Sequence, residues 1–500
     1  MPSLNKETAR KLKKDADKSQ LEKELPEKII QFGEGNFLRA YINWMLQQMN
    51  KQQLFNGRSV AIQPTPHGKV VPKLNKQDGL FTTILQGIEE GEEKQEIEVN
   101  STISRSINPY EDWEGLLKLA ESESIEFIFS NTTEAGLAYK EEAFPENETP
   151  LSFPGKLTAL LYRRFTHTNG GAGFTIIPCE LVEDNGNLLK SIVLRLAEEW
   201  KLPEAFAEWV ENRNIFCNTL VDRIVPGYPK DTVKEWESRL GYEDTLMAVG
   251  EPFHLFVIEA DSSLEEKLPF QKAGLNVKWD EVKPYRDLKV SLLNAPHTLL
   301  FSVGFLSGLN TVREVMEDNT ISSYVRRVIF DDILPHLPFD QKEKEAFATS
   351  VIERFQNPFV KHQLVDLGLN AVQKLKSRVF PLLKHQEHVP VSFSYSLAAL
   401  LHYYKPYTFH CGHFMGLHKG RQYKVRDDEI VLNAFTEFWK YKQQNKEDIA
   451  DLLSNQKIWE QDLSYLTEDV FHYFENIGLS GAKAAAEMML QTVSPVENQK

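Results

Sequence analysis

The stretch Lys28-Ile29-Ile30-Gln31-Phe32-Gly33-Glu34-Gly35-Asn36-Phe37-Leu38-Arg39-Ala40 decides the fold. Residues 28–32 predict a short buried strand, and the glycine turn follows it at once. From residue 36 to residue 50 the apolar side chains recur at helical spacing. A strand, a glycine turn and a helix in this order form the first half of a nucleotide-binding unit.

The two glycines of this turn have distinct physical uses. Gly33 permits a tight turn, and Gly35 lets the backbone approach a pyrophosphate at a helix N-terminus. The dinucleotide fingerprint asks for a third glycine where this chain has Leu38, although Ala40 offers small-residue packing. An ordinary strand–helix turn is the alternative. We expect cofactor contacts along the whole segment, at Ile29, Ile30, Gln31, Phe32, Gly33, Glu34, Gly35, Asn36, Phe37, Leu38, Arg39 and Ala40.

Two further strand ends bear on the cofactor. The predicted strand 59–63 ends in Gln63 without the carboxylate that usually binds the adenosine ribose, so this position leaves NAD and NADP open. Gln63 suits NAD, whereas Arg58 and Lys69 keep NADP open. The predicted strand 127–130 is followed by polar residues that would face a ligand cleft, or would form a turn that caps a helix. The candidates there are Asn131, Thr132 and Glu134.

The rest of the chain predicts two domains. Strands at 81–85, 96–103, 174–178, 253–259 and 277–279 accompany helices at 113–121 and 156–166, which indicates a mainly parallel sheet with helices on both faces. After residue 285 the patterns are helical, at 320–334, 341–355, 391–404 and 430–444. We therefore expect a solvated helical leader (1–25), a Rossmann-type α/β domain (26–284) and an all-helical domain (285–500), with ligands bound in a cleft between the two domains.

Composition limits the classes of partner. The formal charge of −15 over 500 residues argues against nucleic acid as a partner but leaves a small anionic substrate open. The sparse cysteines, Cys179, Cys217 and Cys411, fit a reducing compartment, so we expect a cytoplasmic protein. The apolar stretch 292–309 contains polar groups that favour a buried helix over a membrane span. The oligomeric state stays open.

A lysine, an asparagine and a histidine stand together in that apolar stretch. At α-helical spacing Asn294 and His297 lie about 60° apart, and Lys289 lies about 80° from His297. This set suits ketone reduction, because a protonated lysine can protonate the carbonyl oxygen while Asn294 donates a hydrogen bond to it. His297 would orient the same oxygen or a neighbouring hydroxyl, and Pro296 would kink the helix. A buried helix with polar packing residues is the alternative.

Other chemistries have little support. His410, Cys411, His413 and His418 have metal-like spacing, but a histidine-rich surface loop is the favoured interpretation, and we expect no metal. The sequence contains no nucleophile elbow of the G-x-S-x-G type and no phosphate-binding P-loop.

The chain resembles the polyol-specific long-chain dehydrogenases, the mannitol dehydrogenase family, over roughly residues 25–490. The resemblance rests on the segment 29–40, the Ser130-Asn-Thr-Thr-Glu-Ala-Gly136 turn and the Lys289, Asn294, His297 triplet, with further matches at 176–181, 219–224 and 357–363. The Asn131–Gly136 turn and Lys361-His362 resemble the branch that acts on tagaturonate. The resemblance implies NAD-dependent interconversion of D-tagaturonate and D-altronate in hexuronate catabolism.

The resemblance also implies roles for individual residues. Lys289 would be the acid/base, Asn294 would polarise the carbonyl and His297 would contact the substrate. Lys374, ahead of Pro381, matches a lysine that binds substrate in mannitol dehydrogenase. A substrate carboxylate needs a cation, and our hypothesis is that Lys361, His362, Lys374 or Arg378 supplies it, unless these are solvated helix charges.

The chain departs from the family pattern at two positions. Leu181 follows Cys179-Glu180 where an asparagine is usual, so a second oxyanion donor is in doubt unless Asn185 replaces it. Arg286 replaces a glutamate three residues before the lysine, which removes the basis for a proton relay. The alternatives are a fructuronate reductase, a mannitol-type polyol dehydrogenase, or a non-catalytic NAD-binding sensor.

Overall fold

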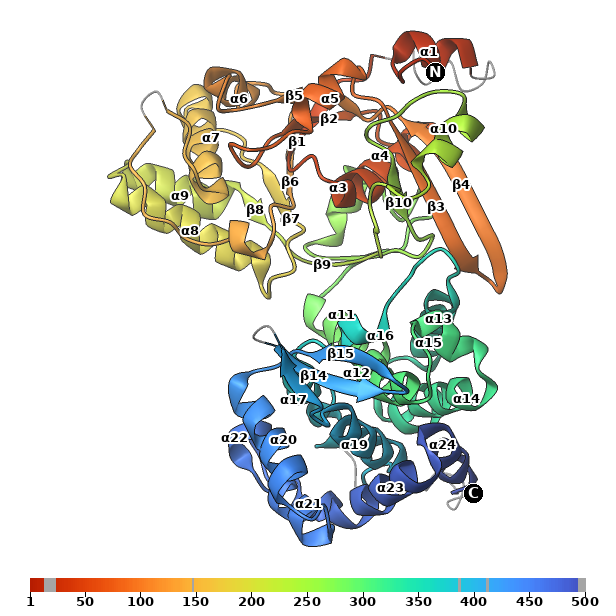
Figure 1. The fold of residues 1–500 in the computed structure, drawn as a ribbon. Coiled ribbons are helices and arrows are strands. Elements are labelled where there is room, and N and C mark those ends of the chain that lie inside the picture. Colours follow the sequence, from red (N-terminus) through yellow and green to blue (C-terminus); the bar gives the residue numbers. More distant parts are fainter. Residues whose placement is uncertain (13–23, 146–147, 385–387, 411–412, 493–500) are drawn as a thin grey trace. The chain divides into compact units, whose positions relative to one another are not determined.

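The computed structural model describes residues 1–12, 24–145, 148–384, 388–410 and 413–492 (Figure 1). The chain forms two compact units. The first comprises Met1–Gln86 and Glu93–Tyr285, and the second comprises Gly87–Glu92 and Arg286–Lys500. Among the described residues, no helix combines the length and apolar character needed to cross a membrane.

A six-stranded sheet organises the first unit. Its order is β5-β2-β1-β6-β7-β8, and every neighbouring pair is parallel. The sheet strands are β1 (Glu27–Phe32), β2 (Arg58–Ile62), β5 (Ile103–Ile107), β6 (Phe127–Ser130), β7 (Thr175–Pro178) and β8 (Ile215–Phe216). Chain order reverses between β1 and β6, which is the point where open α/β sheets bind ligands beyond the carboxyl ends of their strands. The predicted α/β fold is confirmed.

Helices and two small sheets complete the first unit. The helices are α1 (Lys6–Leu12), α3 (Asn36–Ala40), α4 (Ile42–Lys51), α5 (Val71–Lys76), α6 (Trp113–Leu119), α7 (Phe153–Thr168), α8 (Asn185–Glu199), α9 (Glu204–Arg213) and α10 (Val233–Leu240). The small sheets are β10-β3-β4 and β12-β11-β9, formed by β3 (Phe81–Glu89), β4 (Glu92–Asn100), β9 (Asn218–Asp222), β10 (Ala248–Gly250), β11 (Leu255–Glu259) and β12 (Val277–Trp279).

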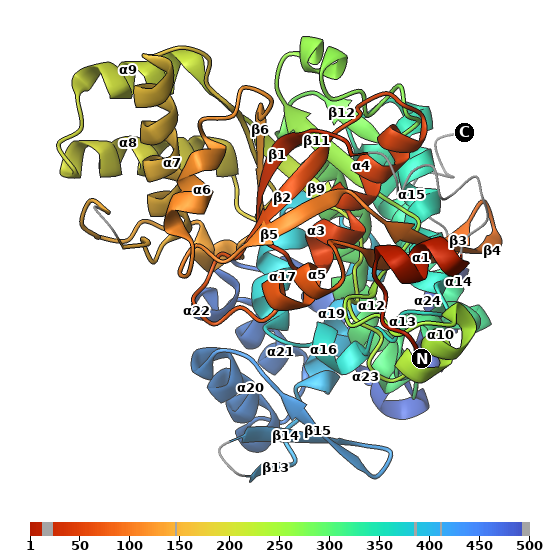
Figure 2. The ribbon, with the colours of Figure 1, turned by 90° about the horizontal axis from the view of Figure 1, so that it is seen from above.

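Alternate residues of the central strands fill two separate cores. Ile30 and Phe32 point into a core with α6, α7, α8 and α9, whereas Ile29 points into a second core with α3, α4 and strands β9, β11 and β12. Figure 2 shows α6–α9 gathered on one side of the sheet and α4 with β11 and β12 on the other (Figure 2). Burial on both faces explains why the adjacent residues Ile29 and Ile30 of β1 are both apolar.

Three predicted elements differ in detail. The helix expected over 36–50 is interrupted at Tyr41 (φ −122°, ψ −80°), whose hydroxyl donates to the Leu255 carbonyl oxygen at 2.5 Å. The strand expected over 96–103 is two strands, because the Asn100 side chain accepts from the Thr102 N–H at 2.9 Å and turns the chain. The expected solvated leader is partly packed, since Leu4 and Ala9 are buried against Leu80 and its neighbours.

The second unit is helical, as expected, except that it also carries a three-stranded antiparallel sheet, β13-β14-β15, so the expectation of an all-helical domain is corrected. Its helices are α11 (Val282–Lys289), which begins just before the unit, α12 (Ala295–Leu306), α13 (Val312–Glu317), α14 (Asn319–Arg327), α15 (Gln341–Gln356), α16 (Leu364–Leu367), α17 (Ala371–Arg378), α18 (Phe380–Leu383), α19 (Val391–Tyr403), α20 (Glu429–Tyr441), α21 (Lys446–Leu453), α22 (Gln456–Trp459), α23 (Thr467–Ser480) and α24 (Ala482–Gln491). The strands are β13 (Thr408–His410), β14 (His413–His418) and β15 (Arg421–Val425).

Candidate active site

The turn after β1 uses its two glycines differently. Gly33 has φ +121°, and a Cβ built on it would lie 2.9 Å from the Asn131 carbonyl oxygen. Gly35 begins α3 with φ −69°, and a Cβ there would meet nothing within 4 Å. Gly33 is therefore required by the fold, whereas Gly35 leaves open space above the start of a helix, as the close approach of a pyrophosphate requires.

Most side chains of the segment 29–40 serve packing. Ile29, Ile30, Phe32, Leu38 and Ala40 are buried, so their side chains belong to the core and not to a ligand. Leu38 stands where the fingerprint has its third glycine, and its side chain packs beneath the turn. A Cβ built on Gly33 would lie 3.1 Å from Leu38 Cδ1.

The buried guanidinium of Arg39 holds the turn together. It donates to the Glu34 carbonyl oxygen and, at 2.8 Å, to Asn36 Oδ1. Burial lowers the pKa of Arg39 to about 10. Arg39 therefore fixes the backbone of the turn, and the sequence alone did not indicate this role.

A buried carboxylate organises the turn after β6. Glu180 accepts from Ser130 Oγ at 3.0 Å, from the Thr132 N–H at 2.9 Å and from Thr132 Oγ1 at 3.0 Å. Burial raises the pKa of Glu180. The Asn131 amide donates to the Cys179 carbonyl oxygen at 2.7 Å, while Glu134 is exposed. The side chains of Asn131 and Thr132 are thus engaged in holding two strand ends together.

The residues expected near the adenosine ribose occupy different places. The Gln63 amide donates to the Thr65 carbonyl oxygen at 2.8 Å and to Asn108 Oδ1 at 3.3 Å, so its N–H groups are taken by the protein. Arg58 lies at the opposite, amino end of β2, and its Nε donates to the Leu25 carbonyl oxygen at 2.9 Å. Arg58 is therefore no candidate for a ribose phosphate, whereas Lys69 is exposed in the loop after β2.

In the second unit, the lysine, asparagine and histidine lie on one helical run that contains a π turn. α11 ends at Lys289, a π turn spans Val290–Asn294, and α12 begins at Ala295 with Pro296 in its first turn. A π turn closes between residues five apart, so Lys289 and Asn294 fall on one face, whereas α-helical spacing would separate them by about 140°. At Pro296, where a kink was expected, the structure has this wider turn directly before the proline.

His297 is the most buried member of the triplet, with 7% of its surface exposed. Its ring lies 4.3 Å from the Phe355 ring and 4.8 Å from the His362 ring, between centroids. Burial, reinforced by the charges of His362, Arg354 and Arg378, holds its pKa well below the usual range. The ring hydrogen-bonds the backbone at Leu293, while Nε2 is buried without a partner among the described residues. A neutral His297 with an unpartnered Nε2 is an acceptor for a hydroxyl.

Cationic residues surround this histidine. Arg378 Nη1 lies 3.5 Å from the hydroxyl of Thr298, which in turn donates to the Asn294 carbonyl oxygen at 2.9 Å. Lys374, one turn earlier on α17, donates to the Leu367 carbonyl oxygen at 2.9 Å. Burial, followed by the charge of Arg378, lowers the pKa of Lys374.

Three of the four expected substrate residues therefore gather around His297. They are His362, Lys374 and Arg378, whereas Lys361 is exposed. Sequence reasoning missed Arg354 and Phe355, which α15 contributes to the same cluster, because only the packing of α15 against the π turn brings them there.

Asn185 does not supply the second oxyanion donor that the sequence left open. It is fully buried, and its amide donates to the carbonyl oxygens of Pro178 and Glu180 at 3.2 and 3.0 Å and to Thr219 Oγ1 at 3.1 Å. Its Oδ1 accepts from the Thr219 N–H at 2.9 Å. Every hydrogen-bonding position of this amide side chain is used inside the first unit, so it serves structure.

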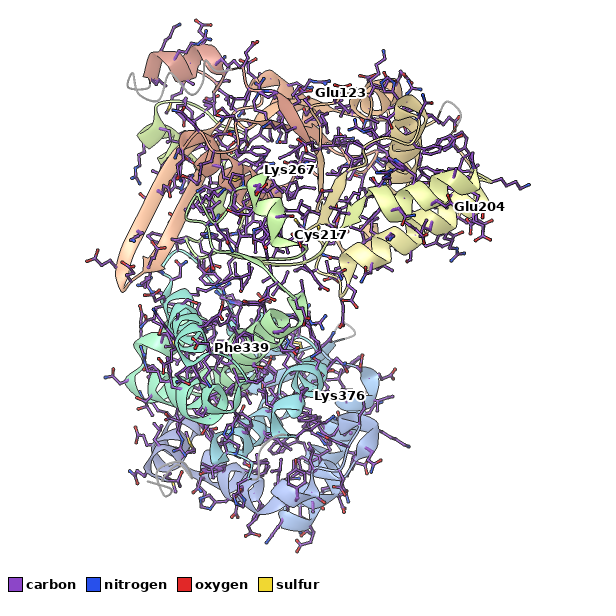
Figure 3. All side chains as sticks on the ribbon, turned by 180° about the vertical axis from the view of Figure 1, so that it is seen from behind. Glu123, Glu204, Cys217, Lys267, Phe339 and Lys376 are labelled. Carbon is purple, nitrogen blue, oxygen red and sulfur yellow. The ribbon has the colours of Figure 1, made fainter. Side chains whose placement is uncertain are left out.

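Cys179 and Cys217 are buried free thiols, and burial raises the pKa of Cys217, labelled in Figure 3, to about 12 (Figure 3). Cys411 of the histidine-rich loop lies outside the described residues. Among the residues that are described, no group of three or more His, Cys, Asp or Glu side chains could hold a metal ion.

Known proteins resemble this chain over most of its length. The description "Mannitol dehydrogenase Rossmann domain" matches residues 27–272, and "Mannitol dehydrogenase C-terminal domain" matches residues 281–477. An altronate oxidoreductase of Halalkalibacterium halodurans is 47% identical over 95% of this chain and 94% of its own length. An altronate oxidoreductase of Enterobacter sp. (strain 638) is 40% identical over 93% of this chain and 97% of its own.

Solved structures share the fold. A D-sorbitol dehydrogenase in substrate-free form aligns over 97% of this chain and 100% of its own, with a TM-score of 0.79 and 23% identity. A Pseudomonas fluorescens mannitol 2-dehydrogenase, in ternary complex with NAD and D-mannitol, covers 98% of this chain and 100% of its own, with a TM-score of 0.68 and 20% identity. The chain belongs to the mannitol dehydrogenase family, a family of oxidoreductases that act on CH–OH groups.

Proposed function

We propose that this protein is a tagaturonate reductase, which reduces D-tagaturonate to D-altronate with NADH. The observation that carries the proposal is the 47% identity to an altronate oxidoreductase over nearly the full length of both chains. The Lys289, Asn294, His297 triplet, aligned on one face by the π turn, supports a carbonyl reduction. The cationic cluster around His297 supports an acidic sugar as substrate.

The first unit has the features that a dinucleotide requires. The open space at Gly35 and the start of α3 would receive the pyrophosphate, and the turn backbone held by Arg39 would form its cradle. The mannitol 2-dehydrogenase of the same fold was solved with NAD. When bound, NADH supplies a hydride to the carbonyl carbon of the substrate. We assign cofactor binding to residues 26–284 and the substrate residues to 285–500.

Within this proposal the triplet divides the work at the carbonyl group. The Lys289 ammonium gives a proton to the carbonyl oxygen as negative charge develops there. The Asn294 amide donates a hydrogen bond to the same oxygen. His297 accepts a hydrogen bond and does not donate one to the carbonyl oxygen. Because its ring is neutral and Nε2 lacks a partner, it accepts a hydrogen bond from a neighbouring substrate hydroxyl.

The substrate carboxylate pairs with α17 in this arrangement. Arg378 and Lys374 stand one helical turn apart, with the Arg378 charge acting on His297 and the Lys374 charge acting on His362. An arginine fork matches the two oxygens of a carboxylate, and Lys374 adds a second positive charge. Lys361, exposed one residue before His362, is the weakest of the four candidates. The buried free thiols agree with a reducing compartment, and we place the enzyme in the cytoplasm.

The substrate and the role of Lys289 are tested together by following NADH absorbance. D-Tagaturonate, D-fructuronate and D-fructose are added in turn to the wild-type protein and to Lys289→Ala. We expect turnover to be fastest with tagaturonate, and to fall by about 10³-fold or more in the variant while NADH binding persists. Preference for fructuronate or fructose would reassign the substrate, and undiminished turnover by Lys289→Ala would refute the mechanism.

The carboxylate contact is tested with Arg378→Gln and Lys374→Gln. Loss of a charged hydrogen bond worth about 1.5–3 kcal/mol should raise the KM for tagaturonate by about 10- to 100-fold. The KM for an uncharged ketose, measured on the same preparations, should change far less. Arg313→Gln, an exposed arginine of the same unit paired with Glu317, is the matched control. An equal rise in KM for both substrates would show that these cations do not bind the carboxylate.

A further inference from the structure

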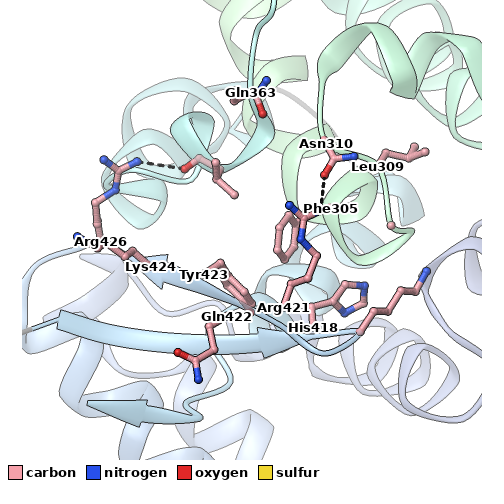
Figure 4. Close-up of a pocket in the computed structure, with 13 residues that line it drawn as sticks. Phe305, Leu309, Asn310, Gln363, His418, Arg421, Gln422, Tyr423, Lys424 and Arg426 are labelled. Atoms are coloured by element: carbon pink, nitrogen blue, oxygen red, sulfur yellow. Dashed lines mark hydrogen bonds between the residues drawn. The ribbon is translucent and has the colours of Figure 1, made fainter. Parts of the chain in front are cut away.

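A cavity lies in the second unit. It has a volume of about 460 Å³ and is bordered by the end of α12, the segment around Gln363 and the β14–β15 hairpin (Figure 4). Pockets of this size hold small metabolites. Gln363 follows His362 directly in the chain, but it lines this cavity, whereas His362 contacts His297. None of His297, His362, Lys374 and Arg378 lines the cavity, although Arg426 of its wall lies near enough to act on the charge of Lys374.

The charge of the cavity wall is one-sided. Lys419, Arg421, Lys424 and Arg426 are among its 13 lining residues, and no aspartate or glutamate is. This concentration of positive charge stands in a chain of net charge −15. Within the described part of the chain, Arg426 is the one of the four with a carboxylate partner, Asp366 at 3.1 Å. A cleft lined by one sign of charge concentrates ligands of the other sign.

The hairpin holds two of these cations in place. Lys419 (φ 46°) and Gly420 (φ 78°) form its tight turn, a backbone that positive φ values permit. Lys419 Nζ donates to the Ser307 carbonyl oxygen at 3.2 Å, and Arg421 Nη1 donates to Asn310 Oδ1 at 3.2 Å. Figure 4 shows the Arg421 side chain directed towards Asn310. Preorganised cations lose less conformational entropy when they bind an anion.

The floor of the cavity is aromatic and rigid. The Tyr423 ring lies 4.6 Å from the Phe305 ring, and its hydroxyl donates to the Tyr403 carbonyl oxygen at 2.7 Å. On the wall, His418 Nε2 is buried without a hydrogen-bond partner among the described residues. An apolar floor beneath a cationic rim suits a ligand with a small organic body and a strongly anionic group.

We propose that this cavity binds a small organic phosphate, such as a sugar phosphate. The dianionic phosphate would lie among Arg421, Lys424 and Arg426, and the organic body would rest on the aromatic floor. Three cations without a carboxylate partner among the described residues, beside Arg426 with its Asp366, exceed what a single carboxylate requires, which favours the doubly charged group. The proposal does not depend on the reaction that the protein catalyses.

The test is calorimetric titration of the whole protein at low ionic strength with glucose 6-phosphate, glucose and inorganic phosphate. We expect saturable binding of glucose 6-phosphate, no binding of glucose and weaker binding of inorganic phosphate. Arg421→Gln with Lys424→Gln should weaken binding by about tenfold or more. Lys424→Gln alone, at an exposed position, guards against misfolding of the double variant.

Two further variants locate the binding. Arg378→Gln, in the substrate cluster, and Arg313→Gln, on the outer surface, should bind glucose 6-phosphate as the wild-type protein does. Loss of binding in Arg378→Gln with retention in the Arg421/Lys424 variant would place the phosphate in the substrate cluster and overturn the proposal. Equal affinity for glucose, or for inorganic phosphate alone, would also overturn it. Turnover of tagaturonate is measured separately, so failure here leaves the proposed reaction standing.

Discussion

Gly33 and Gly35 stand two residues apart and are glycines for different reasons. At Gly33 the backbone angle and the nearby Asn131 carbonyl oxygen both exclude a side chain. At Gly35 the backbone angles are ordinary and the space above is open. The first glycine is therefore required by the protein fold, and the second leaves room for a bound molecule.

Paired alanine variants separate these two uses. Gly33→Ala should lower the free energy of unfolding by about 2 kcal/mol or more, because it strains the backbone and crowds Asn131. Gly35→Ala should leave that free energy nearly unchanged and weaken NADH binding by about tenfold. Urea unfolding and NADH fluorescence titration measure the two effects. Full NADH affinity in Gly35→Ala would remove the turn from the cofactor site.

The sequence indicated which residues belong to the candidate site, but it could not indicate the hydrogen-bond partners of those residues. Gly33, Gly35 and the triplet were recognisable because local geometry and chemistry require those residue types at that spacing. The sequence could not show that the Asn185 amide donates its hydrogen bonds to Pro178, Glu180 and Thr219. Nor could it show that Arg58 lies at the amino end of its strand, bonded to Leu25. Such partners come from segments distant in the chain.

At the scale of elements, Pro296 and the π turn form one device. Proline has no N–H to continue an α-helical ladder, and its ring crowds the carbonyl four residues earlier. The chain instead forms the wider turn of Val290–Asn294, which is closed by a hydrogen bond from the Ala295 N–H to the Val290 carbonyl oxygen. π turns of this kind often occur at functional sites. Here the turn brings Lys289 and Asn294 onto a common face.

Pro296→Ala tests this device. Alanine restores the missing N–H, so the α-helix can run through and rotate Lys289 away from Asn294. We expect kcat to fall by about 10- to 100-fold while the fold persists, because misplacement of a catalytic group by about 1 Å can cost that much. Circular dichroism and steady-state kinetics report the two properties. Wild-type kcat in this variant would mean that the alignment does not depend on the proline.

Long elements were predictable and short ones were not. α15 and α19 match their expected spans within a residue, because each carries a helical apolar pattern over several turns. β8 and β10 have two and three residues, too few for any periodicity, and they form only through pairing with β7 and β3. The interruption at Tyr41 depends in the same way on a bond to Leu255, 214 residues away.

At the scale of the molecule, stability belongs to two units with separate cores. One partly buried histidine makes the first unit sensitive to acid. His254 accepts from the Asn276 N–H at 2.9 Å, and its other ring nitrogen lies 3.3 Å from the Pro252 carbonyl oxygen, so it is held neutral. Burial, and then the charge of Arg223, lowers the pKa of His254 to about 3.

The sign of the effect follows from proton linkage. The unfolded chain takes up a proton near pH 6.5, whereas folded His254 does not until about pH 3, so its contribution is complete above pH 6.5 and is lost as the pH falls towards 3. Between pH 7 and pH 5 the first unit should lose about 2 kcal/mol to this group. Urea unfolding of wild type and His254→Gln at both pH values measures this change in the free energy of unfolding, with the exposed His67→Gln as control.

The wild-type protein should lose more stability than His254→Gln by that amount, and calorimetry should show the loss in one of two transitions. If both variants respond to acid as the wild type does, or if a single transition carries the whole chain, then the neutral imidazole does not set the acid limit of a separately stable first unit.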